Sequence, residues 1–206
     1  MKQDLFSPLP PVSVSRETEA RLDQFTALLL RWNARINLVA APDASVLRQR
    51  HIADSLQLLP LIPEGQGPLA DLGSGGGFPG LVLAMALDRP YHLIESDRRK
   101  AAFLQTVAGE LGLTHVTVHA ERIEAVRLPP IAVLTARALG PLDRMLPWAE
   151  ALLAADGVAL FPKGRAAEEE IAAAAPGWTM TIERFKSSTE PNATILRLSG
   201  IRRAGA

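Results

Sequence analysis

Apolar side chains change their spacing part way along the chain. In the first part they recur three or four positions apart, as at Leu22, Phe25 and Leu29. This spacing is typical of amphipathic helices that bury one face. We therefore expect one helix over residues 15–36, capped by Ser15, and a second over residues 43–59.

Beyond residue 68, short apolar runs alternate with helical patterns, and a Pro- and Gly-rich linker separates them from the first part. The expected strands are 68–72, 91–94, 115–119, 131–135 and 157–161, followed by an antiparallel pair at 178–185 and 194–198. The expected helices are 79–87, 98–111, 121–126, 142–154 and 166–175. Strands that alternate with helices are typical of a parallel sheet covered on both faces.

The predicted fold is therefore α/β, with a mostly parallel, seven-stranded sheet. A chain of 206 residues suits one sizeable core rather than two full domains. We expect a single domain over residues 1–206, in which residues 1–66 form an N-terminal helical extension and residues 67–206 a Rossmann-like core.

The composition narrows the possible classes of protein. The chain has no cysteine, which excludes a disulfide scaffold, a thiolate metal site and a cysteine nucleophile. Its formal net charge of zero argues against binding nucleic acid by bulk charge alone. The first residues show no signal-peptide pattern, and the apolar runs are too short to span a bilayer. We expect a cytoplasmic monomer that has no metal site and does not associate with a membrane.

A glycine-rich turn joins the first strand to the first helix of the sheet. It contains Gly73, Gly75, Gly77 and Gly80, and Glu95 follows at the end of the second strand. Glycines allow positive φ and a close approach of a ligand to the backbone, and parallel sheets bind ligands at the carboxyl ends of their strands. This pattern suits a dinucleotide as well as S-adenosylmethionine, because Glu95 stands where an acidic residue takes ribose hydroxyls in either case.

Asp71 distinguishes between these two ligands. A carboxylate just before the first glycine repels a pyrophosphate but suits a cation. S-adenosylmethionine carries a sulfonium and an ammonium group and no phosphate. The turn therefore favours a methyl donor, while a nicotinamide-dependent oxidoreductase or a non-catalytic nucleotide-binding module remains an alternative.

Several separate segments resemble the bacterial small-subunit rRNA guanine-N7 methyltransferases known as RsmG or glucose-inhibited division protein B. The resemblance extends from about residue 15 to residue 198. The segments that carry it are 32–38, 50–56, 71–80, 135–138 and 162–164.

This resemblance implies a Rossmann-like methyltransferase fold with S-adenosylmethionine as donor and S-adenosylhomocysteine as product. It implies methylation of guanine N7 in the decoding-region loop of 16S rRNA, within the small ribosomal subunit or its precursor. Methylation of another RNA, a protein or a small molecule is the alternative. The donor-binding residues that we expect, from the turn and the resemblance together, are Asp71, Gly73, Gly75, Gly77, Phe78, Glu95, Ile123, Glu124 and Arg137.

Two cations are candidates for the catalytic site. Guanine N7 carries an in-plane lone pair and no proton, so the enzyme must align the reactants rather than supply a general base. Arg137 follows the fourth strand and Lys163 the fifth, at the edge where donor and target should meet. The alternatives are a structural salt bridge for Arg137 and an exposed turn position for Lys163.

Other residues have a more ordinary interpretation. His51 and Asp54 could form a base–acid pair, but residues so placed more often fix helix packing through hydrogen bonds. Trp32 fits the buried helical stripe better than a base-stacking platform. Arginines near both termini are expected to frame the sheet edge where RNA enters; these are Arg31, Arg35, Arg48, Arg50, Arg197, Arg202 and Arg203.

Overall fold

The computed structural model describes residues 6–40 and 43–205 and contains one seven-stranded sheet, which confirms the predicted fold class. The strand order is β3-β2-β1-β4-β5-β7-β6, and β7 runs in the direction opposite to the other six strands. The strands are β1 (Leu69–Leu72), β2 (Tyr91–Ile94), β3 (Val116–His119), β4 (Ile131–Ala136), β5 (Leu153–Lys163), β6 (Trp178–Lys186) and β7 (Thr194–Arg203).

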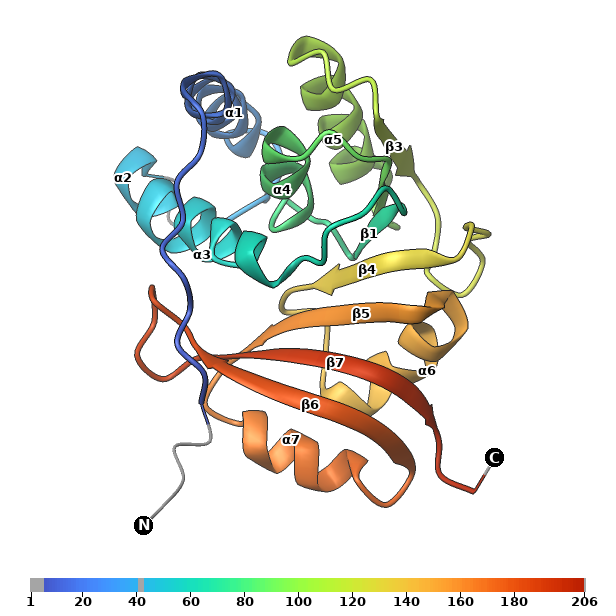
Figure 1. Cartoon of the computed structure of the whole chain (residues 1–206). Helices are drawn as coiled ribbons and strands as arrows, with labels where there is room; N and C mark the ends of the chain where they lie inside the picture. The colour runs from blue at the N-terminus through green and yellow to red at the C-terminus, as the bar shows by residue number, and fades with distance from the viewer. Residues whose placement is uncertain (1–5, 41–42, 206) are drawn as a thin grey trace.

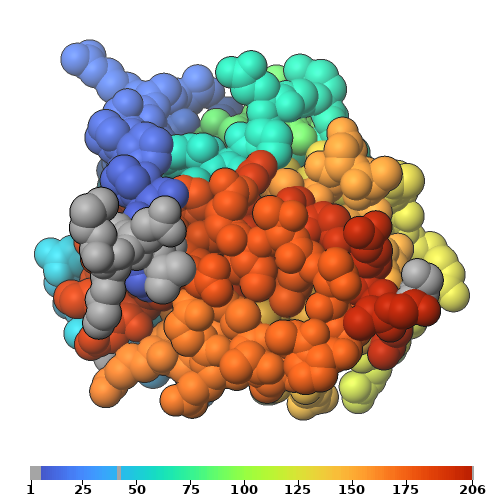
Figure 2. Space-filling model, turned by 60° about the horizontal axis from the view of Figure 1, so that its bottom comes forward, coloured from blue at the N-terminus to red at the C-terminus, as the bar shows by residue number. Residues whose placement is uncertain are grey.

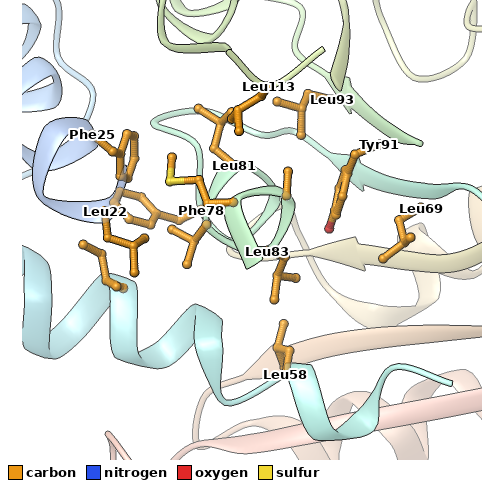
Figure 3. Packing of buried hydrophobic residues seen from close by; sticks show 14 of the residues in the cluster. Leu22, Phe25, Leu58, Leu69, Phe78, Leu81, Leu83, Tyr91, Leu93 and Leu113 are labelled. Carbon is orange, nitrogen blue, oxygen red and sulfur yellow. The ribbon is translucent and has the colours of Figure 1, made fainter. Parts of the chain in front are cut away.

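Helices cover both faces of the sheet (Figure 1). One face carries α1 (Arg16–Asn33), α4 (Gly80–Ala86) and α5 (Arg98–Glu110), while α6 (Leu142–Leu152) and α7 (Ala167–Ala174) lie on the other. Each face has its own hydrophobic cluster. The first contains residues of the N-terminal helices and of the sheet together, as Figure 3 shows for Leu22, Phe25, Leu58, Phe78 and Tyr91.

The second predicted helix is divided into short pieces. Residues 43–61 form α2 (Ala44–Val46), a π-helical segment η1 (Leu47–Ile52), α3 (Ala53–Leu56) and a 3-10 turn η2 (Leu59–Leu61). π-helical segments are rare and are found often at functional sites, because they turn side chains away from the regular helical direction.

One predicted helix is wrong and one boundary lies elsewhere. Residues 121–126 form only a turn, because a six-residue segment followed by Pro129 and Pro130 cannot propagate a helix. α6 ends at Leu152 and β5 begins at Leu153, four residues earlier than expected. The cap of α1 is confirmed, since the Ser15 hydroxyl accepts a hydrogen bond from the amide of Thr18 at 3.1 Å.

The N-terminal segment reaches across to the far edge of the sheet. The Ser7 amide donates to the carbonyl of Arg184 in β6 at 2.9 Å. In Figure 2 the C-terminal segments, orange to red, cover most of the face that comes forward, with blue N-terminal residues beside them. Within the described ranges, no helix is both long and apolar enough to cross a membrane.

The direction of β7 corrects the predicted placement of the C-terminal arginines. Lys163 at the end of β5 pairs with Thr194 at the start of β7. Arg202 and Arg203 therefore lie at the amino edge of the parallel strands, opposite the edge that carries the glycine turn. Arg203 stacks on Trp178 there, with its guanidinium 4.9 Å from the ring centroid.

Candidate functional site

The glycine turn between β1 and α4 adopts the backbone conformation that its sequence predicts. Gly73, Gly75 and Gly77 have φ values of 68°, 54° and 92°, which a residue with a side chain rarely adopts. A Cβ built on Gly75 would meet nothing nearer than the Gly73 carbonyl oxygen, at 3.7 Å. The backbone of the turn at Gly75 is therefore open to a ligand.

Asp71 lies behind the turn rather than on its open side. Its side chain is only 1% exposed. One carboxylate oxygen accepts from the Thr135 hydroxyl at 2.7 Å and the other from the Gly80 amide at 3.2 Å. Asp71 thus ties β1 to β4 and to the start of α4, and the expected direct contact with a cationic ligand does not fit this placement. Burial raises the pKa of Asp71 to about 6, although the hydrogen bond from Thr135 opposes the shift.

Glu95 connects the end of β2 to the turn. Its carboxylate accepts hydrogen bonds from the Gly75 amide and from the Asp97 amide, each at 2.8 Å. The side chain is buried. Because each carboxylate oxygen has two lone pairs, both can still accept from a ribose hydroxyl.

The loop that follows α1 lies against the glycine turn at Gly76. The Asn33 amide oxygen accepts from the backbone amides of Leu38 and Val39, and its nitrogen donates to the Val39 carbonyl. A Cβ on Gly76 would lie 3.2 Å from the Leu38 carbonyl oxygen. Asn33 therefore shapes the loop that rests on the glycine turn.

Arg137, which follows β4, joins three parts of the chain. Its guanidinium lies 5.1 Å from the centroid of the Phe78 ring and donates to the Asp54 carboxylate at 3.3 Å. The Arg137 and Asp54 side chains are 20% and 14% exposed. Phe78, expected at the donor, is buried beneath Arg137 and packs edge-on against Phe25. Arg137 therefore forms a structural salt bridge with Asp54 and also lies at the sheet edge where donor and target should meet.

Asp54 also holds the loop between β6 and β7. Its carboxylate accepts from the Thr189 hydroxyl at 2.9 Å and from the Gln57 side chain at 2.7 Å. The Gln57 side-chain oxygen in turn accepts from the Ser188 amide at 2.8 Å. The N-terminal helices and this loop are thus fixed to each other and to Arg137.

These elements enclose a cavity of about 420 Å³ at the carboxyl ends of β4 and β5, here called the Arg137 cavity. Its wall combines cations, carboxylates and hydroxyls with small apolar side chains. The lining residues are Arg50, His51, Asp54, Ala136, Arg137, Ala138, Gly140, Met145, Pro162, Lys163, Gly164, Glu170, Thr189, Glu190 and Ala193. Ala138 has φ of 54°, a strained value for a residue with a side chain, next to Arg137.

Lys163 is buried in the wall of this cavity and is not the exposed residue that we considered. Its side chain is 7% exposed. The ammonium donates to the Gly140 carbonyl at 2.7 Å and pairs with Glu170 at 2.8 Å. The charge of Lys163 is thus matched within the protein, which leaves little of it for an RNA phosphate.

His51 and Asp54 do not form a base–acid pair, the less favoured of the two alternatives. Asp54 faces Arg137, whereas Nδ1 of His51 is buried without a hydrogen-bond partner among the described residues. Its ring lies 5.1 Å from that of Phe78. Burial lowers the pKa of His51, and the charge of Arg137 lowers it further, although the charge of Asp54 opposes the shift.

The remaining predicted residues divide into two groups. Ile123 and Glu124 lie in the turn after β3, at the same sheet edge as Gly73 and Glu95, with Glu124 exposed. Two of the arginines near the termini are committed elsewhere: Arg48 pairs with Glu19 and Asp23, and Arg197 pairs with Glu183.

Sequence reasoning missed the partners that fix this site. Thr135, Gln57, Glu170 and Thr189 make its hydrogen bonds, and the last three belong to no recognisable motif. Only the Thr135 segment gave a signal, through the family resemblance. Across the described ranges, no three His, Asp or Glu side chains are grouped to hold a metal ion.

Solved structures with this fold include S-adenosylmethionine-dependent enzymes. An O-methyltransferase from Bacillus cereus in complex with SAH superimposes with a TM-score of 0.60 at 17% identity, over 86% of this chain and 91% of that one. The M. jannaschii protein TYW2 in complex with AdoMet gives a TM-score of 0.58 at 14% identity, over 83% of this chain and 80% of that one. At such identities these likenesses establish the fold.

Relatives in sequence are much closer. The ribosomal RNA small subunit methyltransferase G of Acidiphilium cryptum is 58% identical over 93% of this chain and 89% of that protein. The protein of the same name from Gluconobacter oxydans is 51% identical over 93% of this chain and 98% of that protein. The family GidB, described as rRNA small subunit methyltransferase G, matches residues 18–194. This chain therefore belongs to the GidB family of rRNA small subunit methyltransferases.

Proposed function

We propose that this protein transfers a methyl group from S-adenosylmethionine to N7 of a guanine in 16S rRNA. The observation that carries the proposal is the family match over residues 18–194, which includes the glycine turn, Glu95 and Arg137. The bound donor supplies an electrophilic methyl group on a sulfonium, and S-adenosylhomocysteine is its product.

The residues present suit this donor. The open backbone at Gly75 can approach a ligand closely, and the positive φ of Gly73 and Gly77 holds the turn in shape. We assign the ribose to Glu95 and assign further donor contacts to Phe78, Ile123, Glu124 and Arg137. Asp71 acts from behind the turn, by fixing its shape, rather than by touching the donor.

The Arg137 cavity is our candidate for the target base. It lies at the carboxyl ends of β4 and β5, beside the strand that leads into the turn. Arg137 can donate to the guanine edge or to a flanking phosphate. Because N7 has no proton to lose, the chain needs to orient the base and exclude water rather than to abstract a proton. A Lys163 that is paired with Glu170 is compatible with such a reaction.

We assign Lys163 a positioning role within this mechanism. Its ammonium joins the loop after Arg137, through the Gly140 carbonyl, to Glu170 of α7. Lys163 would thereby hold the wall of the cavity rather than contact the reacting atoms.

We further propose that the chain acts in the cytoplasm as a monomer and as one domain. Leu22 and Phe25 of the N-terminal extension share a cluster with Leu81 and Tyr91 of the core, so residues 1–66 and 67–206 should unfold together. The small ribosomal subunit or its precursor is the proposed form of the substrate.

The test is transfer of label from S-adenosylmethionine to small ribosomal subunits that lack the modification. Label should enter 16S rRNA and be released by ribonuclease. Label that survives ribonuclease would point to a protein substrate, and no label in any fraction would overturn the proposed substrate.

A further inference from the structure

A second cavity lies outside the site described above, between the end of α1 and the start of α5. It has a volume of about 300 Å³ and is lined by Arg31, Trp32, Arg35, Ile36, Arg99 and Ala102. We call it the Trp32 cavity. No acidic side chain lines it, and the part of the chain that the structure describes gives Arg31 and Arg35 no salt-bridge partner. The rim is therefore cationic and the floor is apolar and aromatic.

The basic residues at the start of α5 have no evident structural benefit. Arg98, Arg99 and Lys100 occupy the first turn of this helix, which contains no acidic residue. The helix dipole disfavours cations at this end. The Arg99 guanidinium lies 3.9 Å from the carboxylate of the Asp97 cap, a long ion pair, and the Arg99 side chain is 74% exposed. The charge of Arg99 is therefore available to an anionic partner at the rim of the cavity.

The aromatic floor is accessible as well. Trp32 packs on Phe103, with ring centroids 5.7 Å apart, yet it stays half-buried and lines the cavity. Aromatic side chains surrounded by arginines are typical of proteins that bind unpaired nucleotides, because bases stack on the ring while phosphates meet the cations.

The Trp32 cavity also lies beside the glycine turn. Trp32 directly precedes Asn33, which shapes the loop resting on Gly76. Arg99 follows the segment of Glu95 and Asp97 that joins β2 to the turn. The cavity is thus on the β2 side of the turn, whereas the Arg137 cavity is on the β4 and β5 side.

We propose that the Trp32 cavity is a second RNA-binding site, which takes an unpaired base of the substrate on Trp32 and its phosphates on Arg31, Arg35 and Arg99. This inference rests on the proposed function for the identity of the RNA. The two sites would grip the substrate on either side of the donor turn, so that a nucleotide away from the target contributes to recognition.

The test compares two double variants with the same loss of charge. Arg31→Gln/Arg35→Gln removes two cations from the cavity, and Arg202→Gln/Arg203→Gln removes two from the opposite sheet edge. Binding of a 16S rRNA fragment is measured against salt concentration, and methyl transfer gives KM and kcat. The first variant should bind RNA about tenfold more weakly, with a salt slope lower by about 1 to 2, while the second resembles wild type. For the Arg31→Gln/Arg35→Gln variant, kcat and the affinity for S-adenosylhomocysteine should stay within about twofold of wild type.

Trp32 is tested separately by substitution with leucine and with phenylalanine. Trp32→Leu should weaken RNA binding about tenfold, and Trp32→Phe, which keeps an aromatic face, should restore most of it. The proposal is overturned if the arginine variant and its control bind the fragment alike, or if only binding to assembled subunits is weakened, which indicates a protein partner. If wild type binds the fragment with the expected slope but transfers no methyl group to small ribosomal subunits that lack the modification, the proposed function fails while this binding site stands.

Discussion

The two sides of the glycine turn are built in different ways. The turn itself is a continuous segment of the chain with glycines at positive φ. One of its backbone amides, that of Gly75, donates to the carboxylate of Glu95 at the end of the next strand. The Arg137 cavity is made of side chains from remote segments, with 83 positions between Arg137 and Asp54 and 135 between Asp54 and Thr189. A local backbone motif can be recognised in a sequence, whereas a cavity of this kind exists only after the chain has folded.

Lys163 lies in the wall of the Arg137 cavity, but we expect it to contribute mainly to stability, because its charge is paired with Glu170. Lys163→Met removes the ion pair with the partly exposed Glu170 and the hydrogen bond to the Gly140 carbonyl, and should lower the free energy of unfolding by about 3 kcal/mol. Urea denaturation measures this loss. Lys163→Met/Glu170→Gln, which removes both charges, should recover part of it. If the single variant is as stable as wild type but its RNA binding loses about one unit of salt slope, Lys163 contacts phosphate after all.

Arg137 should matter for the reaction itself. Arg137→Gln should lower kcat/KM about 100-fold, because the side chain that orients the base at the sheet edge loses its charge. Asp54→Asn keeps the guanidinium but loosens it, and its effect on kcat/KM should be smaller. Steady-state kinetics at saturating donor gives both values. Wild-type kinetics for Arg137→Gln would remove Arg137 from the catalytic site.

Within the glycine turn, we expect the largest loss of stability from substitution of Gly80. A Cβ there would lie 2.5 Å from Leu93 Cδ2 and 2.6 Å from an Asp71 carboxylate oxygen. Gly80→Ala should therefore cost about 2 to 3 kcal/mol of stability and weaken donor binding. Gly109→Ala is the matched control, because Gly109 lies within α5 with no atom near its Cβ position, and it should stabilise the protein by about 0.5 to 1 kcal/mol. Equal effects of the two substitutions would contradict this account of the turn.

The features of the fold that could be predicted from the sequence are the local ones, as the contrast between the glycine turn and the Arg137 cavity indicates. The strand–helix alternation predicted all seven strands, and the glycines predicted the conformation of the turn. The segment 121–126 misled because its helix-forming residues are too few to nucleate a helix. Asp71 was assigned to the ligand from its sequence position alone, but its hydrogen bond to Thr135, on a neighbouring strand, places it behind the turn.

The roles of the arginines and of Lys163 could not be predicted either, because they depend on contacts between remote residues. Nothing in the sequence distinguishes Arg48, which is paired, from Arg31, which has no salt-bridge partner among the described residues, or shows that Lys163 meets Glu170. The direction of β7 decides on which sheet edge Arg202 and Arg203 lie, and that direction becomes visible only in the strand pairing.

Asp71 gives the smallest predicted effect, through pH. Its pKa is raised to about 6 from 3.8, so the folded state holds the proton more tightly than the unfolded state does. The stability contributed by this group is fully present below the unfolded pKa and is lost as pH rises through about 6. The free energy of unfolding of wild type, relative to Asp71→Asn, should therefore fall by about 2 kcal/mol between about pH 4.5 and pH 7. A difference that does not change with pH would contradict the buried, protonatable carboxylate.

The most direct test of the whole account is to treat small ribosomal subunits that lack the modification with the purified protein and S-adenosylmethionine, and then to map the masses of their 16S rRNA fragments. The account predicts a single added methyl group on one guanine, located at N7, which makes the backbone at that nucleotide cleavable after reduction and treatment with aniline. A methyl group on another base or another atom of guanine, or rRNA that gains none, would contradict it.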